Sequence, residues 1–278
     1  NETEKTLKIG INESALDTLG TEGYHLMVHD GGMTLMANTT SGTFNGLQTI
    51  KQLLPVKREV SEDGDMLPIQ IKNCEIEDAP RFGWRGLMLD VSRHFFDVAE
   101  VKGFIDLMAL YKFNKFHWHL TDDQGWRIEI KKHPKLTSIG GFRDSTVIGH
   151  FSDSPRKYAT ENYGGFYTQE EIKEVVAYAN TKFITVVPEI EMPGHSSSAL
   201  AAYPEYSCNQ KKQSVPGVWG VFDNIYCTKE ETFVFLETIL EEITDLFPGD
   251  YIHIGGDEAP KTNWEYCINC QKTIQDNA

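Results

Sequence analysis

The chain has little positive charge and no long apolar run. Lys and Arg number 26 against 41 Asp and Glu, which gives a formal net charge of −15. A field of this sign repels phosphate, so general binding of nucleic acid or of an anionic membrane surface is disfavoured. No stretch of the 278 residues approaches the roughly 18 apolar residues of a membrane span. With 40% hydrophobic and 24% charged residues, the composition is typical of a folded globular protein.

Cysteines are also few, and their number is odd. Of the five, Cys74 lies in an alternating, strand-like stretch and is the expected buried thiol. Cys267 and Cys270 have the CxxC spacing, but half a zinc site needs a second pair, and we expect none to be available. A thioredoxin-like context is missing as well. The sequence therefore predicts a disulfide or two thiols at this position, and no metal ligands.

The start of the chain carries no sign of a leader. Asn1 is not preceded by Met, and no charged and then apolar segment follows it. We expect either that a targeting segment was removed or that the sequence starts internally.

Residues 1–78 predict a small α/β domain. Apolar alternation and a helical spacing give, in chain order, a strand over 24–28, a turn at 30–32, a strand over 33–37, a helix over 43–54 and a strand over 69–71. This region contains no cluster of chemically reactive groups.

In residues 79–278 the expected order of elements is different, because strands and helices alternate. The expected strands are 84–91, 115–120, 184–190 and 251–254, and the expected helices include 99–111 and 230–247. A further helix is expected after Thr168, with Glu171 completing a capping box. An irregular stretch covers roughly residues 132–167. The pattern predicts βα units on a parallel sheet.

Each of these four strands runs into polar residues. The segments that follow them are 90–94, 121–126, 188–195 and 255–258. In a (β/α) barrel the active site is built at the C-terminal ends of the strands. Four successive strands that obey this rule indicate an enzyme of that architecture.

The Asp257–Glu258 pair is the sharpest chemical feature. Two adjacent carboxylates repel one another, so one of them is expected to be held protonated, as a donor to a glycosidic oxygen must be. Gly255 and Gly256 would let the backbone approach a ligand closely. The alternative is a solvated loop end.

Other strand-end residues admit two interpretations each. Asp122 is either a turn cap or a functional carboxylate, His195 a surface histidine or a group that orients an acid, and Arg93 an ion-pair partner or a clamp for vicinal hydroxyls. His117 and His119 face the same way on a strand, where they either bind a metal or line the barrel interior.

Four segments closely resemble the motifs of glycoside hydrolase family 20, the β-N-acetylhexosaminidases. They are residues 85–96, 117–127, 187–195 and 253–258. Residues 1–78 are similar to the small α/β domain that precedes the barrel in this family. The resemblance covers essentially the whole chain and implies an N-terminal domain over 1–78, followed from residue 79 by a (β/α)8 TIM-type barrel.

The resemblance also implies a mechanism. Glu258 would be the general acid/base, and Asp257 would hold the substrate's 2-acetamido group. The acetamide oxygen would attack C1 and form an oxazoline-like intermediate, a stated exception to the two-carboxylate scheme. Asp122 and His195 would tune Glu258, and Arg93 would bind distal hydroxyls. No metal or organic cofactor is implied, and the partners would be glycans that end in N-acetylhexosamine.

Two further expectations follow from the family. Cys208 and Cys227 fall where some bacterial members have a loop disulfide, which implies an exported enzyme, periplasmic, secreted or at the cell surface. The family's barrel has eight strands, whereas the sequence predicts about four βα units. We therefore expect the 278-residue chain alone to be weakly active or inactive, and to self-associate through an open barrel edge.

Two other functions stay open at this stage. One is a metal-dependent barrel hydrolase that uses His117, His119 and His195. The other is a non-catalytic carbohydrate-binding remnant.

Overall fold

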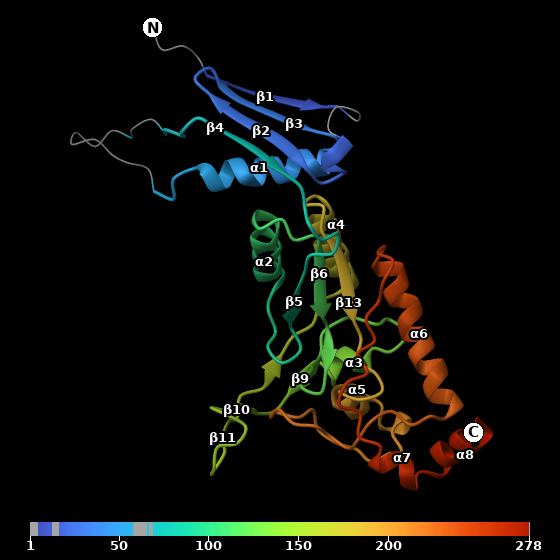
Figure 1. The fold of residues 1–278 in the computed structure, drawn as a ribbon. Coiled ribbons are helices and arrows are strands. Elements are labelled where there is room, and N and C mark those ends of the chain that lie inside the picture. The colour runs from blue at the N-terminus through green and yellow to red at the C-terminus, as the bar shows by residue number, and fades with distance from the viewer. Residues whose placement is uncertain (1–4, 13–16, 58–65, 67–68, 278) are drawn as a thin grey trace. The chain divides into compact units, whose positions relative to one another are not determined.

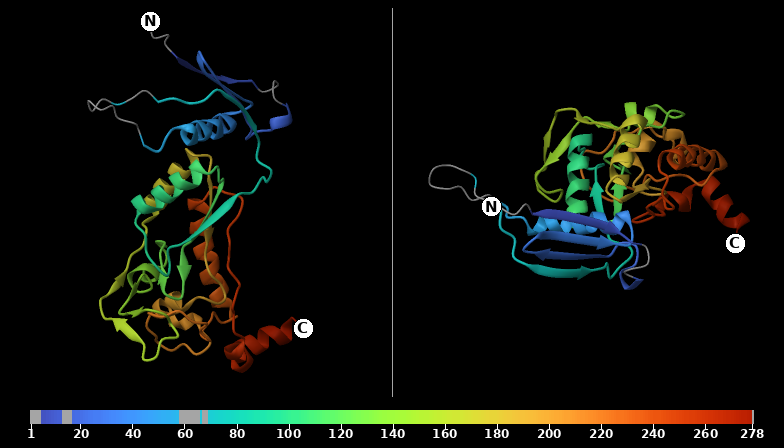
Figure 2. Two further views of the ribbon diagram at one scale, coloured as in Figure 1. Left: turned by 60° about the vertical axis from the view of Figure 1, so that its left-hand side comes forward. Right: turned by 90° about the horizontal axis from the view of Figure 1, so that it is seen from above.

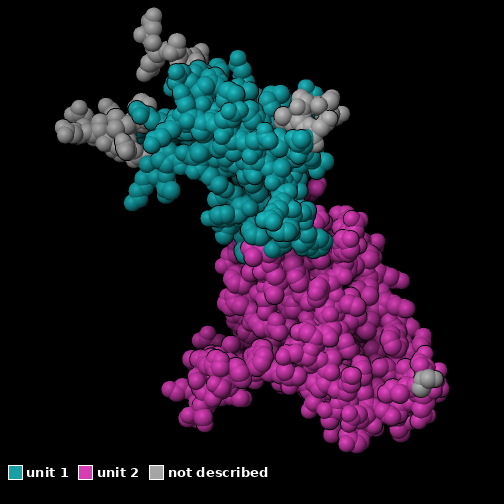
Figure 3. Space-filling view, viewed as in Figure 1, with its two compact units in different colours: residues 1–86, 104–114, 182–184 teal, residues 87–103, 115–181, 185–278 magenta. Residues whose placement is uncertain are grey.

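The computed structural model describes residues 5–12, 17–57, 66 and 69–277. It divides into two compact units (Figure 3). Unit 1 comprises residues 1–86, 104–114 and 182–184, and unit 2 comprises residues 87–103, 115–181 and 185–278. The predicted domain boundary at residue 78 coincides with the end of a strand.

Unit 1 contains a four-stranded sheet in the order β1-β3-β2-β4. The strands are β1 (Thr6–Ile11), β2 (Tyr24–His29), β3 (Gly32–Ala37) and β4 (Cys74–Asp78). β1 pairs with β3 in parallel, whereas β2 pairs with β3 and β4 antiparallel. The predicted hairpin is confirmed, with Val28 opposite Met33.

The helix α1 (Thr40–Leu53) lies against one face of this sheet (Figure 2). Leu47, Ile50 and Leu53 pack against the buried core of the sheet, so the predicted apolar stripe is confirmed. The helix begins three residues before the predicted start, because Thr39 caps it by accepting a hydrogen bond from the Gly42 amide. A short 3-10 helix, η1 (Asp17–Leu19), precedes β2.

The strand predicted over 69–71 was wrong. The register places Val28 opposite Cys74 and Tyr24 opposite Asp78. Since β2 ends at His29, residues before Cys74 lie beyond the reach of most of its hydrogen-bonding groups. The strand is β4, with Cys74 partly buried against the core rather than fully buried as predicted.

Unit 2 is built on a three-stranded sheet in the order β13-β6-β5 (Figure 1). Its strands are β5 (Gly86–Asp90), β6 (Lys115–His119) and β13 (Thr185–Glu189), and β13 pairs with β6 in parallel. The predicted strands 84–91, 115–120 and 184–190 are confirmed, each shorter than expected. Their sequential order across the sheet is that of successive βα units.

The predicted helices are confirmed as α2 (Val98–Leu110), α4 (Gln169–Asn180) and α6 (Glu230–Leu246). The predicted capping box is present at α4: the Thr168 hydroxyl accepts from the Glu171 amide, and the Glu171 carboxylate accepts from the Thr168 amide. The residues of α2 from Phe104 onward belong to unit 1.

The fourth predicted strand, 251–254, is reduced to one parallel bridge between Glu189 and His253. His253 donates its amide to Pro188 O (2.9 Å), and Ile190 donates to His253 O (3.0 Å), so the segment still runs beside β13. Positive φ angles at Gly255 and Gly256, +67° and +104°, end the extended conformation directly afterwards.

The connections contain short elements. They are β7 (Thr121–Asp122), β8 (Gly125–Trp126), α3 (Lys135–Ser138), β9 (Phe142–Arg143), β10 (Thr146–Ile148), β11 (Lys157–Ala159), β12 (Tyr163–Gly164), α5 (Ser197–Ala202), η2 (Pro204–Tyr206), α7 (Thr262–Tyr266) and α8 (Ile268–Asp276). The stretch predicted to be irregular thus carries two small strand pairs, β9 with β12 and β10 with β11. None of the described helices is long and apolar enough to cross a membrane.

Candidate active site

The carboxyl ends of the unit 2 strands bring polar side chains together. His119 ends β6 and stands opposite Glu189, which ends β13. His119 Nδ1 is hydrogen-bonded to Glu189, and His117 Nε2 and His253 Nδ1 lie 2.7 and 2.8 Å from the same carboxylate. Although burial opposes ionisation, the bonds from His117 and His119 lower the pKa of Glu189. Glu189 is therefore an anion that fixes three imidazoles.

Asp122 is fully buried and contacts Arg93, His119 and His195. Its Oδ2 lies 2.6 Å from Arg93 Nη2 and 2.9 Å from His119 Nε2. Burial alone would raise the pKa of Asp122, but hydrogen bonds with His119 and His195 lower it to about 2. Burial likewise opposes charge on His119, yet its bonds to Asp122 and Glu189 raise the pKa of the imidazole to about 10. Both groups are charged near neutral pH.

Two carboxylates and a side-chain amide hold Arg93. Besides Asp122, its guanidinium donates to Asp90 Oδ2 (2.9 Å) and to Gln124 Oε1 (3.1 Å). Asp90 also accepts from the backbone amides of Ser92 and Arg93, which fixes the turn after β5. About a third of the Arg93 side chain, 32%, stays exposed. These contacts fix the guanidinium, and part of the side chain stays accessible to a ligand.

His195 is buried, with its two ring nitrogens facing different acids. Nδ1 lies 3.0 Å from Asp123 Oδ2 and 3.2 Å from Asp122 Oδ1. These two carboxylates raise the pKa of His195 to about 11. Asp123 is itself fixed by the Ser197 amide at the start of α5, at 2.9 Å. The ring is therefore an imidazolium held in one orientation.

The other nitrogen of His195 faces the Asp257–Glu258 pair. Nε2 lies 3.4 Å from Glu258 Oε2 and 3.6 Å from Asp257 Oδ2, distances of ion pairs rather than of close hydrogen bonds. The two carboxylate side chains are 46% and 65% exposed, respectively. Glu258 has a φ of +43°, a conformation that is rare for residues other than glycine. Such strain is frequent where a side chain has to be aimed.

Gly255 lets the backbone pass close to a further buried acid, Glu191. A Cβ on Gly255 would stand 1.7 Å from Glu191 Oε2, so any other residue there would have to displace the Glu191 carboxyl. Glu191 is buried, and its Oε2 has no hydrogen-bond partner among the described residues. Burial, aided by the charges of Glu189 and Asp257, raises the pKa of Glu191 to about 8. Glu191 is therefore mostly neutral at pH 7.

The five predicted site residues form one chain of contacts. It runs from Arg93 through Asp122 and His195 to Asp257 and Glu258. Asp123, which follows Asp122 in the strand-end segment 121–126, is the closer partner of His195. Glu191 and Glu189 were missed as individual residues, although both stand in a strand-end segment that the sequence singled out.

The predicted metal alternative fits this geometry poorly. His117, His119 and His195 fall into separate groups of candidate ligands among the described residues. His117 and His119 instead anchor the base of the site through Glu189.

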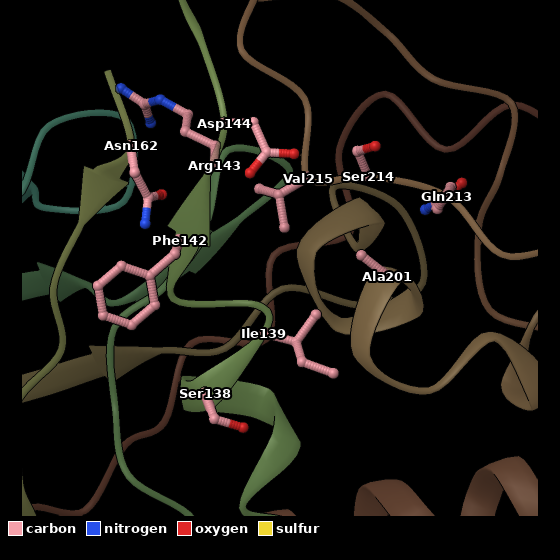
Figure 4. A pocket seen from close by; sticks show the side chains of 10 residues that line it. All are labelled: Ser138, Ile139, Phe142, Arg143, Asp144, Asn162, Ala201, Gln213, Ser214 and Val215. Atoms are coloured by element: carbon pink, nitrogen blue, oxygen red, sulfur yellow. The ribbon is translucent and has the colours of Figure 1, made fainter. Parts of the chain in front are cut away.

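A separate cavity of about 520 Å³ lies elsewhere in unit 2 (Figure 4). It is lined by Ser138, Ile139, Phe142, Arg143, Asp144, Asn162, Ala201, Gln213, Ser214 and Val215. None of the predicted site residues lines it. Arg143 connects it to the site, because its guanidinium donates to the backbone oxygens of Gln124 and Arg93, both at 3.0 Å.

Comparisons with known proteins agree with this architecture. Residues 82–278 match the model of the glycosyl hydrolase family 20 catalytic domain, and residues 1–79 match that of domain 2 of the same family. The chain is 47% identical over 257 residues to a beta-hexosaminidase of Porphyromonas gingivalis, a match that covers 92% of this chain and 31% of that protein.

Two solved structures extend the comparison. A crystal structure of a beta-N-acetylhexosaminidase superposes with a TM-score of 0.82 at 37% identity, covering 100% of this chain and 56% of that one. A Streptomyces plicatus beta-hexosaminidase variant in complex with its product GlcNAc superposes with a TM-score of 0.78 at 40% identity, covering 97% and 51%. This chain thus spans about a third to a little over half of these relatives' lengths.

Carboxylates at the ends of successive strands are typical of the active-site end of a TIM-type barrel. The chain belongs to glycosyl hydrolase family 20, since the family's catalytic-domain model matches well over half of it. The predicted fold class, a small α/β domain followed by part of a (β/α)8 barrel, is confirmed.

Proposed function

We propose that the protein is an exo-β-N-acetylhexosaminidase, which removes terminal N-acetyl-β-D-hexosamine from glycans with retention of configuration. The observation that carries the proposal is the contact between the His195 imidazolium and Glu258, at 3.4 Å, with Asp257 adjacent. Family membership supports the same activity.

In the first step, Glu258 acts as general acid. It gives a proton to the glycosidic oxygen while the C1–O bond to the leaving group breaks. The acetamide carbonyl oxygen forms a bond to C1 from the opposite face and produces an oxazolinium ion. Asp257 accepts a hydrogen bond from the acetamide N–H and stabilises the positive charge that develops there.

In the second step, Glu258 acts as general base. It takes a proton from water, whose oxygen attacks C1 and displaces the acetamide oxygen. Two inversions at C1 give net retention. The His195 imidazolium stabilises the ionised form of Glu258 that exists between the steps, and Asp122 and Asp123 keep His195 protonated.

Arg93 is proposed to bind hydroxyls of the terminal sugar. Its partly exposed guanidinium is fixed by Asp90, Asp122 and Gln124, so little conformational entropy is lost when a ligand binds. A neutral sugar needs no basic surface, which agrees with the net charge of −15.

The acetamide nucleophile gives the sharpest test. We compare the intact protein on an aryl N-acetyl-β-glucosaminide and on its N-trifluoroacetyl analogue, which has a much poorer carbonyl nucleophile. The kcat should fall by at least about tenfold, equivalent to ~1.4 kcal/mol of barrier. Equal rates would contradict participation by the acetamide. Sugar binding without turnover of either substrate would instead support a carbohydrate-binding remnant.

A further inference from the structure

Four cysteines from separate parts of unit 2 meet at one point. They are Cys208, which follows η2, Cys227, in the loop before α6, and Cys267 and Cys270, at the start of α8. We refer to these four residues as the cysteine cluster. Their Sγ atoms all lie within 4.8 Å of one another. The expectation that no second pair of cysteines is available to the CxxC pair was wrong. The fold brings Cys208 and Cys227 to it from about 40 to 60 residues upstream.

The sulfur separations fit a metal better than disulfides. Cys208 and Cys270 are 3.6 Å apart, Cys227 and Cys267 are 3.6 Å apart, and Cys227 and Cys270 are 3.7 Å apart. A disulfide needs a separation of about 2.05 Å. A tetrahedral zinc ion with Zn–S bonds of about 2.3 Å places its sulfur atoms about 3.8 Å apart. Cys227 is also almost equally close to two partners, which is not the arrangement of two separate pairs.

Two features of the backbone stabilise negative charge at the sulfurs of Cys270 and Cys267. Cys227 and Cys270 are buried, whereas Cys208 and Cys267 are partly exposed. The Thr228 amide donates to Cys270 Sγ at 3.5 Å. Cys267 is the N-cap of the nine-residue helix α8, where the helix dipole stabilises negative charge.

We propose that the cysteine cluster binds one zinc ion in a closed tetrathiolate site. Four sulfur ligands at tetrahedral spacing suit zinc, and they leave no open position for water, so the site is structural rather than catalytic. The zinc site replaces the disulfide between Cys208 and Cys227 that we expected, and it removes the support that this disulfide gave to export.

The cysteine cluster links the segment that follows Glu258 to the loop before α6. α7 begins at Thr262, four residues after Glu258, and runs directly into α8 (Figure 2). Trp264 Nε1 donates to Tyr226 O at 2.8 Å, and Thr273 Oγ1 donates to Thr228 O at 3.0 Å. These bonds and the cluster fasten the segment after Glu258 to the loop before α6. Zinc would therefore limit the motion of the chain that carries the candidate acid.

Metal analysis tests the site on the intact protein, purified without chelator or added metal. We expect one zinc ion per chain by elemental mass spectrometry. Cys267→Ser should lose it, and Cys74→Ser, the matched control in β4, should retain it. Zinc retained by Cys267→Ser, as binding at the histidines around Glu189 would give, would overturn the proposal.

A thiol count covers the case in which Cys267→Ser does not fold. The 278-residue chain, denatured with chelator but without reductant, should show five reactive thiols, the number of its cysteines. A single thiol would mean two disulfides and would overturn the proposal. Cobalt exchanged into the wild type should give the thiolate charge-transfer and visible bands of a tetrahedral site, and their absence would contradict it. None of these readouts depends on the proposed activity.

Discussion

Glu191 is the most unusual single residue of the site, because it is a buried acid whose Oε2 has no partner among the described residues. Its pKa is about 8 in the folded protein, against 4.5 in an ordinary environment. Between these values the unfolded chain releases the proton and the folded chain keeps it. The folded state therefore loses stability as pH rises from about 4.5 to 8, and the loss levels off above that.

Glu191→Gln mimics the neutral carboxyl and should remove this loss. We expect its Tm to exceed that of the wild type by a few degrees at pH 8, and to match it closely at pH 4. Differential scanning calorimetry at the two pH values measures the effect. Glu237→Gln, an exposed position on α6, is the control and should change Tm little at either pH. A lower Tm for Glu191→Gln at pH 8 would contradict the account.

The sequence predicted which residues lie together in the site, but not which of them form hydrogen bonds or ion pairs with one another. Asp122, His195 and Glu258 follow three different strands, and the rule that strand ends converge was enough to group them. Whether Asp122 or Asp123 faces His195 depends on the turn between β7 and β8, and a separation of 3.0 against 3.2 Å cannot be read from spacing. The neutral state of Glu191 depends on burial, which the sequence does not encode locally.

At the scale of elements, the turn at Gly255 and Gly256 determines where Asp257 and Glu258 point. Both glycines have positive φ, but only Gly255 lies against another group, the Glu191 carboxyl. A Cβ at Gly256 would meet nothing within 4 Å. The two positions therefore separate backbone strain from steric collision.

Gly255→Ala should destabilise the fold through backbone strain and through collision with the Glu191 carboxyl. Gly256→Ala should destabilise it through backbone strain alone. We expect the first to lower Tm further than the second and to reduce kcat at least about tenfold, equivalent to ~1.4 kcal/mol. Thermal unfolding and steady-state kinetics on the same preparations measure both effects. Equal losses in the two variants would show that the contact with Glu191 does not position the segment.

Elements with strong local signals were predicted well. The capping box at Thr168 and Glu171 and the apolar stripe of α1 each depend on residues three or four positions apart in the sequence. Elements fixed by distant partners were predicted less well. Residues 69–71 look like a strand, yet the register of β2 selects Cys74–Asp78 instead.

At the scale of the whole molecule, an apolar strand stays uncovered. Leu87 and Met88 of β5 are 38% and 50% exposed, although a strand of a barrel sheet is normally buried on both faces. An exposed apolar edge strand promotes pairing with another chain.

We therefore expect the 278-residue chain to self-associate. Light scattering should show a mass that rises with protein concentration, and Met88→Lys should reduce the rise. Ile148→Lys replaces an equally exposed apolar residue of β10 and serves as the control. A monomer at all concentrations would count against association through β5.

The cysteine cluster shows the limit of prediction at this scale. The sequence separates Cys208 and Cys227 from the CxxC pair by tens of residues, and only the packing of α7 and α8 against the loop unites them. The barrel architecture, in contrast, could be inferred from alternating elements and from polar residues at strand ends.

The central claim is that Glu258 is the general acid/base, and Glu258→Gln in the intact protein tests it most directly. We expect kcat on an aryl N-acetyl-β-glucosaminide with a poor leaving group to fall about 10²–10⁴-fold. The loss should shrink for a strongly activated leaving group, which needs no protonation, while Tm stays unchanged because the side chain is half-exposed. Glu265→Gln, an exposed neighbour on α7, should keep full activity. A Glu258→Gln variant that retains most of its activity on both substrates would contradict the account.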